Sequence, residues 1–146
     1  MKNFDSYRII NIIFAGVIGL VFIYSCLFLP DGGKHLIPSF YADITGNTSP
    51  SLGLSRAFSA LVRGQFGLAS QFNPHALKIF AFFCFQFLFR LISLKVDRIA
   101  FINRKTWIRV DIILSISLFL IVFYPLIIFT LVTVWDIFTT VIFKLG

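Results

Sequence analysis

The sequence is short of charge and of cysteine, and it has no glutamate. Only 13% of its 146 residues are charged, against about 25% in a typical soluble domain. Its two cysteines are too few for the disulfide framework that stabilises small secreted domains. These shortages exclude a soluble globular domain and a disulfide-stabilised scaffold.

Apolar residues dominate instead. They make up 58% of the chain, and Phe alone fills 20 positions. This composition excludes disorder and indicates an integral membrane protein, with room for about three or four spans of roughly 20 residues. Lys and Arg outnumber acidic residues 13 to 6 and flank the apolar runs. We therefore expect anionic phospholipid headgroups, and no nucleic acid, as the partner of the basic residues.

Three apolar segments predict an all-α integral membrane protein with a single domain, 1–146, and spans at about 9–29, 75–94 and 111–134. The first segment is longer than the core of a cleaved signal peptide, roughly 7–15 residues, so we expect a membrane helix there. Pro125 predicts a kink in the third. The stretch 135–146 either continues the third helix or lies at the interface.

The distribution of Lys and Arg predicts the orientation. The N-terminus and the connection 95–109 carry more basic residues than the connection 30–74 and the C-terminus. Because cytoplasmic regions are enriched in Lys and Arg, we expect a cytoplasmic N-terminus, an external connection 30–74 and an external C-terminus.

The external connection 30–74 has two halves. Turn-forming residues fill the first half. In the second half, apolar residues recur at spacings of three and four, which predicts an amphipathic interfacial helix over about 54–72, weakened in its middle by Gly64 and Gly67. The residues expected to dock to lipid or a partner there are Arg56, Arg63, Phe58 and Leu61.

The same region carries a motif. It reads Thr45-Gly46, then Ser49-Pro50-Ser51-Leu52-Gly53-Leu54-Ser55-Arg56-Ala57, then Gly64-Gln65-Phe66 and Asn73-Pro74. Over about 40–91, the chain resembles a bacterial membrane family catalogued as domain of unknown function 2752, whose pattern is Cys-Pro-x-Cys-Gly-Leu-Thr-Arg-Ala followed by Asn-Pro. The resemblance implies a bacterial inner membrane, with a periplasmic C-terminus.

The departures from the family pattern bear on chemistry. Ser49 and Leu52 replace both family cysteines, so neither thiol redox exchange nor metal ligation is expected at these positions. Gly53, Asn73 and Pro74 are kept, and these three residue types suit a structural turn followed by a helix.

Ionisable and polar residues near the membrane edges are expected to pair, because a lone charge in lipid is costly. We expect Arg90 to pair with Asp111 on the cytoplasmic side and Lys78 with Asp136 outside. Gln86, near the middle of its segment, should face protein rather than lipid.

We expect no catalytic, cofactor-binding or metal-binding set. The sequence has no phosphate-binding loop and no Ser-His-Asp pattern, and His35 and His75 lack acidic or Cys neighbours at ligand spacing. Cys26 and Cys84 are expected to be buried apolar fillers.

Three functions fit this description. The first is a non-catalytic accessory or structural subunit of a larger inner-membrane complex, which docks to other integral membrane proteins through its spans and its external helix. The second is a membrane enzyme that acts on lipid or lipid-linked substrates at the outer face. The third is a small oligomeric transporter or channel, although few polar residues are available to line a path.

Overall fold

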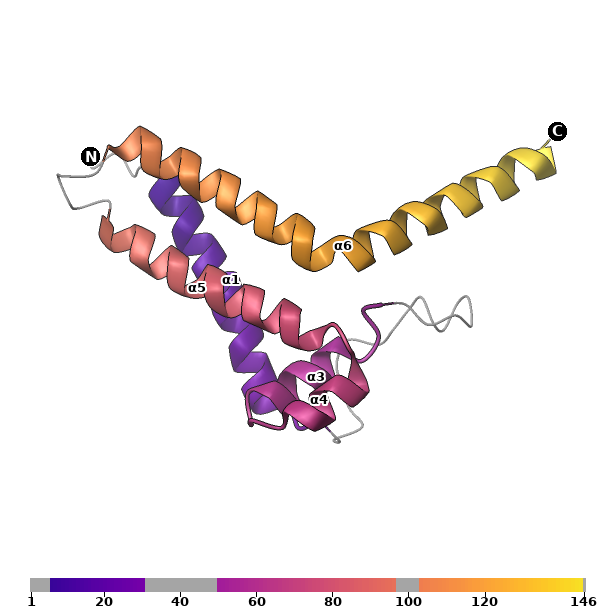
Figure 1. Ribbon diagram of the computed structural model, residues 1–146, viewed down its shortest axis with the longest axis horizontal. Coiled ribbons are helices and arrows are strands. Elements are labelled where there is room, and N and C mark those ends of the chain that lie inside the picture. The colour runs from indigo at the N-terminus through magenta and orange to yellow at the C-terminus, as the bar shows by residue number, and fades with distance from the viewer. Residues whose placement is uncertain (1–5, 31–49, 97–102, 146) are drawn as a thin grey trace.

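The computed structural model describes residues 6–30, 50–96 and 103–145, and this part of the chain folds into helices without a strand (Figure 1). Residues 31–49 of the expected connection 30–74, including His35, Thr45-Gly46 and Ser49 of the sequence analysis, and residues 97–102 of the connection 95–109 lie outside the described residues. The helices are α1 (Ser6–Leu27), α3 (Leu54–Leu61), α4 (Phe66–Phe72), α5 (Ala76–Val96) and α6 (Arg104–Leu145).

Three of these helices, α1, α5 and α6, are long and apolar enough to cross a membrane. The prediction of an all-α chain with three such helices is confirmed. Large apolar side chains cover their outer surfaces, which suits contact with lipid.

Helix α6 is longer than the expected span 111–134, because it has 42 residues. It passes through Pro125 without ending, but its direction changes there (Figure 1). Proline bends a helix because it lacks an N–H donor and its ring clashes with the carbonyl four residues earlier. The expected kink is therefore present, and the helix continues beyond it to Leu145.

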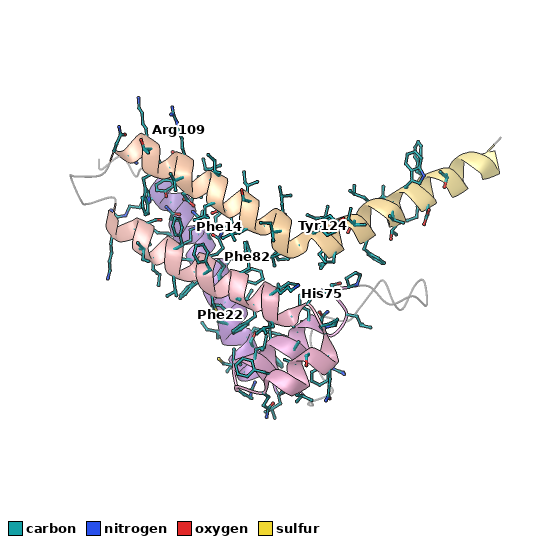
Figure 2. The ribbon with its side chains drawn as sticks, in the orientation of Figure 1. Phe14, Phe22, His75, Phe82, Arg109 and Tyr124 are labelled. Carbon is teal, nitrogen blue, oxygen red and sulfur yellow. The ribbon has the colours of Figure 1, made fainter. Side chains whose placement is uncertain are left out.

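Aromatic side chains join the long helices to one another. Phe22 of α1 packs edge-on against Phe80 and Phe87 of α5, with ring centroids 5.5 and 5.8 Å apart. Phe82 of α5 meets Phe123 of α6 in the same way at 5.4 Å. Figure 2 shows such side chains between the helices, with Phe22 and Phe82 labelled. Edge-to-face rings pack favourably without any polar group, which suits helix contacts in lipid.

Helices α3 and α4 form a compact unit at the end of the bundle where α1 ends and α5 begins (Figure 1). The region 54–72, expected to form one helix, forms two helices instead, α3 and α4. Gly64 stands at the break with φ +74°, in the left-handed region that glycine adopts without strain. The chain turns back after this residue, so that α4 packs against α3.

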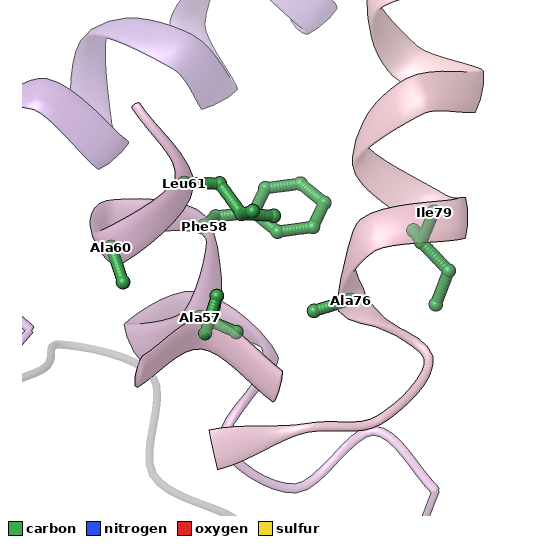
Figure 3. Close-up of a cluster of buried hydrophobic side chains, with 7 residues drawn as sticks. Ala57, Phe58, Ala60, Leu61, Ala76 and Ile79 are labelled. Atoms are coloured by element: carbon green, nitrogen blue, oxygen red, sulfur yellow. The ribbon is translucent and has the colours of Figure 1, made fainter. Parts of the chain in front are cut away.

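The apolar residues of this unit face inward. Phe58 and Leu61 of α3 point towards Ala76 and Ile79 at the start of α5 (Figure 3). Phe58 is 4% exposed and Leu61 is 5% exposed. The apolar side of α3 is thus covered by the chain's own helices.

Candidate functional site

A buried polar cluster lies at the end of the bundle where α1 and α6 begin and α5 ends. Each of the three helices contributes two residues that are four positions apart, a spacing that places both on one helix face. The cluster consists of Tyr7 and Asn11 from α1, Gln86 and Arg90 from α5, and Asp111 and Ser115 from α6.

Arg90 binds residues of all three helices at once. Its Nη1 donates to Asp111 Oδ2 at 2.6 Å and to Asn11 Oδ1 at 2.8 Å. Its Nη2 donates to Ser115 Oγ at 2.9 Å and to Gln86 Oε1 at 3.2 Å. The planar guanidinium carries several donors in fixed directions, which makes it suited to joining several elements.

Asp111 receives further hydrogen bonds. Tyr7 donates its hydroxyl to Oδ2 at 2.7 Å, and Ser115 donates to Oδ1 at 3.0 Å. The side chains of Arg90 and Asp111 are 8% and 2% exposed. The carboxylate is therefore neutralised by Arg90 and its oxygens are occupied, which is the condition for keeping a charge out of water at a tolerable cost.

Aromatic rings cover the ion pair. The guanidinium carbon of Arg90 lies 5.4 Å from the ring centroid of Phe14 and 6.0 Å from that of Phe89. Trp107 stacks on Phe89 with centroids 5.6 Å apart. These rings lie against the guanidinium and interact favourably with the cation.

The cluster has more donors than acceptors. Asn11 Nδ2, Gln86 Nε2 and Arg90 Nε are buried without a hydrogen-bond partner. The side-chain amides of Asn11 and Gln86 both direct their oxygens at Arg90. Their NH2 groups therefore point away from Arg90. Because unsatisfied buried donors lower stability, the benefit of the cluster is a defined packing of three helices rather than stability alone.

At the other end of the bundle, Arg63 follows α3 by two residues and binds the end of α1. Its Nη1 donates to Ser25 O at 3.0 Å and to Ser59 O at 2.6 Å, and its Nη2 donates to Cys26 O at 2.7 Å. Ser25 and Cys26 lie in the last turn of α1, where carbonyls lack partners within the helix and the helix dipole favours a cation. Arg63 is therefore directed at the protein and not at headgroups.

The motif residues Gly53, Asn73 and Pro74 connect the start of α3 to the start of α5, and we call this connection the joint. Gly53 has φ +75°, and a Cβ there would lie 2.4 Å from Phe72 O. Asn73 donates its Nδ2 to Pro50 O at 2.7 Å and Leu52 O at 2.9 Å, and its Oδ1 accepts from His75 N at 2.8 Å. Asn73 thus caps α5 in the manner of a helix N-cap, and Pro74 follows in the position that tolerates proline best.

The structure brings together some of the expected site residues. It contradicts the expected burial of Cys26, which is exposed near the end of α1, and Cys84 is half-buried. The predicted contact between Arg90 and Asp111 is present, and Gln86 joins it. Beyond its bend, α6 leads away from α5 (Figure 1), and the pairing expected between Lys78 and Asp136 stays a prediction. Arg56 is exposed, and its guanidinium carbon lies 6.0 Å from the ring centroid of Phe72.

Sequence reasoning missed three members of the cluster, Tyr7, Asn11 and Ser115. A signal for them existed: polar pairs spaced four apart recur in or directly beside all three apolar segments, and each pair occupies one helix face. The described residues contain no group of three or more His, Cys, Asp or Glu that could hold a metal ion. Comparison of the chain with protein-family models, with curated proteins and with solved structures finds no match.

Proposed function

We propose that the chain is a non-catalytic accessory subunit of a larger protein complex in a bacterial inner membrane. In this proposal it belongs with the family catalogued as domain of unknown function 2752, its N-terminus is cytoplasmic and its C-terminus is periplasmic. The supporting observation is the Arg90 cluster. Its charged groups neutralise each other and hold three helices together, so they serve packing and offer no open acid, base or nucleophile.

The unit of α3 and α4 is the proposed docking surface for another integral membrane protein. Two of its residues face outward: Arg56 is exposed, and Phe66 is 61% exposed. An aromatic side chain and an arginine are the residue types most enriched where protein interfaces gain their affinity. Arg63, Phe58 and Leu61 support this surface from behind, because their contacts lie within the chain.

The partner of the opposite end is proposed to be the anionic headgroups of the cytoplasmic leaflet. Arg104, Lys105 and Arg109 follow each other along the first turns of α6 and are exposed. Basic side chains beside a span contribute about 1 kcal/mol each near an anionic surface.

A photo-crosslinking residue placed at Phe66 in the full chain, in its native membrane, tests the docking proposal. We expect one adduct of defined mass with another membrane protein, and we expect Arg56→Ala to lower its yield severalfold. The same crosslinker at Phe58, which is buried, should give no adduct, and Lys78→Ala, an exposed basic residue of α5, should leave the yield unchanged.

Two outcomes would overturn the accessory role. One is adduct formation at Phe66 that is insensitive to Arg56→Ala. The other is a measurable turnover of a lipid-linked substrate that Arg56→Ala abolishes, which would favour the enzyme.

A further inference from the structure

Two hydroxyls and one backbone carbonyl lie on the side of α6 that faces away from the core cluster. They belong to Ser117, Ile121 and Tyr124, whose spacings of four and three place them on one helix side. Ile121 and Tyr124 are 72% and 63% exposed, and Ser117 is exposed too. The α6 residues that pack on the core cluster lie on the opposite side, and they are Val122, Phe123 and Leu126.

The described part of the chain leaves these groups short of hydrogen bonds. Pro125 has no N–H, so the carbonyl of Ile121, four residues earlier, lacks the usual donor of the helix. The hydroxyls of Ser117 and Tyr124 bind no partner among the described residues. Thr130 of the same helix, by contrast, donates its hydroxyl to the carbonyl four residues earlier at 2.8 Å.

In the proposed orientation, Arg109 lies at the headgroups and the three groups lie deeper, inside the membrane. At a rise of about 1.5 Å per residue, Ser117 follows Arg109 by about 12 Å along α6, and Tyr124 follows it by about 22 Å. Both depths fall within the hydrocarbon core, which is roughly 30 Å thick. Lipid chains offer neither donors nor acceptors, so a neighbouring helix is what satisfies polar groups at this depth.

We propose that this side of α6 binds a transmembrane helix of the partner protein, and that this helix presents an Asn or Gln side chain to Ile121 and Tyr124. A side-chain amide has an NH2 donor for the Ile121 carbonyl and an oxygen that accepts from the Tyr124 hydroxyl. One amide reaches both, because a helical side chain leans towards the N-terminus and brings the Tyr124 hydroxyl level with Ile121. A charged donor would cost more free energy in hydrocarbon.

A second copy of this chain does not supply such an amide. The amide side chains within α1, α5 and α6 are Asn11 and Gln86, which are 0% and 5% exposed in the Arg90 cluster. The helix that fits therefore belongs to a different protein. This inference rests on the accessory role, because it names the part of the partner that α6 contacts.

A photo-crosslinking residue at Leu120, which is 53% exposed beside the three groups, tests this contact in the native membrane. We expect an adduct with another membrane protein, in which the crosslinked peptide lies in a transmembrane segment and has Asn or Gln within one helical turn. Tyr124→Phe should lower the yield severalfold, because it removes only the hydroxyl. Thr130→Val is the matched control and should leave the yield unchanged, since the Thr130 hydroxyl is satisfied within its own helix.

The isolated chain provides the folding control. Because the Tyr124 hydroxyl has no partner among the described residues, Tyr124→Phe should leave the thermal unfolding of the detergent-extracted protein unchanged. Each of four results would overturn the inference: an adduct with twice the mass of the chain, adducts with lipid alone, a yield insensitive to Tyr124→Phe, or a crosslinked segment without Asn or Gln. The crosslink at Phe66 judges the accessory role separately. An Arg56-dependent adduct at Phe66 without a protein adduct at Leu120 would retain that role and refute the contact of α6.

Discussion

At the scale of single residues, Arg90 and Asp111 determine how the three long helices meet. Either charge alone within the bundle would be unpaired and nearly buried, whereas together they satisfy each other and engage Tyr7, Asn11 and Ser115. The pair therefore favours one rotation of each helix over the others. This is how a polar cluster specifies packing among surfaces that are otherwise uniformly apolar.

A double-mutant cycle measures this coupling. Arg90→Ala and Asp111→Ala should each lower the free energy of unfolding by about 3–5 kcal/mol, because each leaves an uncompensated buried charge. The double variant should lose clearly less than the sum. Thermal unfolding of the detergent-extracted protein is the measurement.

The control for this cycle pairs Arg90→Ala with Asp136→Ala. Asp136 lies in the part of α6 that leads away from α5, so the effects of these two substitutions should add. If the losses from Arg90→Ala and Asp111→Ala also add, the ion pair contributes no coupling and the packing role of the cluster is refuted.

At the scale of elements, the joint between α3 and α5 holds the unit of α3 and α4 in place. Gly53 lets the chain pass close to the end of α4, and Asn73 ties the turn before α3 to the first turn of α5. The presence of Gly53, Asn73 and Pro74 at these positions is thus explained by backbone geometry and hydrogen bonding, without any reaction chemistry.

Substitution of the two left-handed glycines tests the joint. Gly53→Ala should destabilise the protein by about 1–3 kcal/mol from backbone strain, plus the cost of a Cβ 2.4 Å from Phe72 O. Gly64→Ala is the matched control, since Gly64 has φ +74° but nothing within 4 Å of its added Cβ. Loss of helical circular dichroism on heating should show the larger loss for Gly53→Ala, and equal losses would contradict the close approach to Phe72.

At the scale of the whole molecule, the cluster at one end and the joint at the other hold the bundle together, and the basic residues predict its orientation. Arg8, Lys95, Arg104, Lys105 and Arg109 lie at the end of the bundle that carries the Arg90 cluster. Because this end is the richer in basic residues, it should face the cytoplasm.

Single-cysteine labelling with a membrane-impermeant maleimide tests the orientation. In a background with Cys26→Ser and Cys84→Ser, Gln65→Cys should react in intact cells, because Gln65 is exposed beside α4 at the end of the bundle that we expect outside. Asn103→Cys, which is exposed just before α6, should react only after lysis. The reverse pattern would show that the chain threads the membrane in the opposite sense.

Much of the fold could be predicted because membrane helices are specified locally. An apolar run near 20 residues long must form a helix in lipid, since every backbone donor and acceptor needs a partner within the segment. The positions of α1 and α5 follow from that condition, and the kink follows from the missing N–H and the ring of Pro125. The contact of Arg90 with Asp111 was also predictable, because two opposite charges near one edge of the membrane have few other partners.

The tertiary structure decided what local sequence leaves open, namely the rotation of each helix and the course of the chain beyond a kink. The surfaces of α1, α5 and α6 are apolar nearly all round, so composition does not say which side of each helix faces the other helices. Only packing directs Tyr7, Asn11 and Ser115 towards Arg90, and turns Arg63 from the membrane surface to the end of α1. The same holds for α6. Its apolar residues predict its length, whereas only the tertiary structure shows that Leu126 is the last α6 residue packed against the core cluster in the described chain.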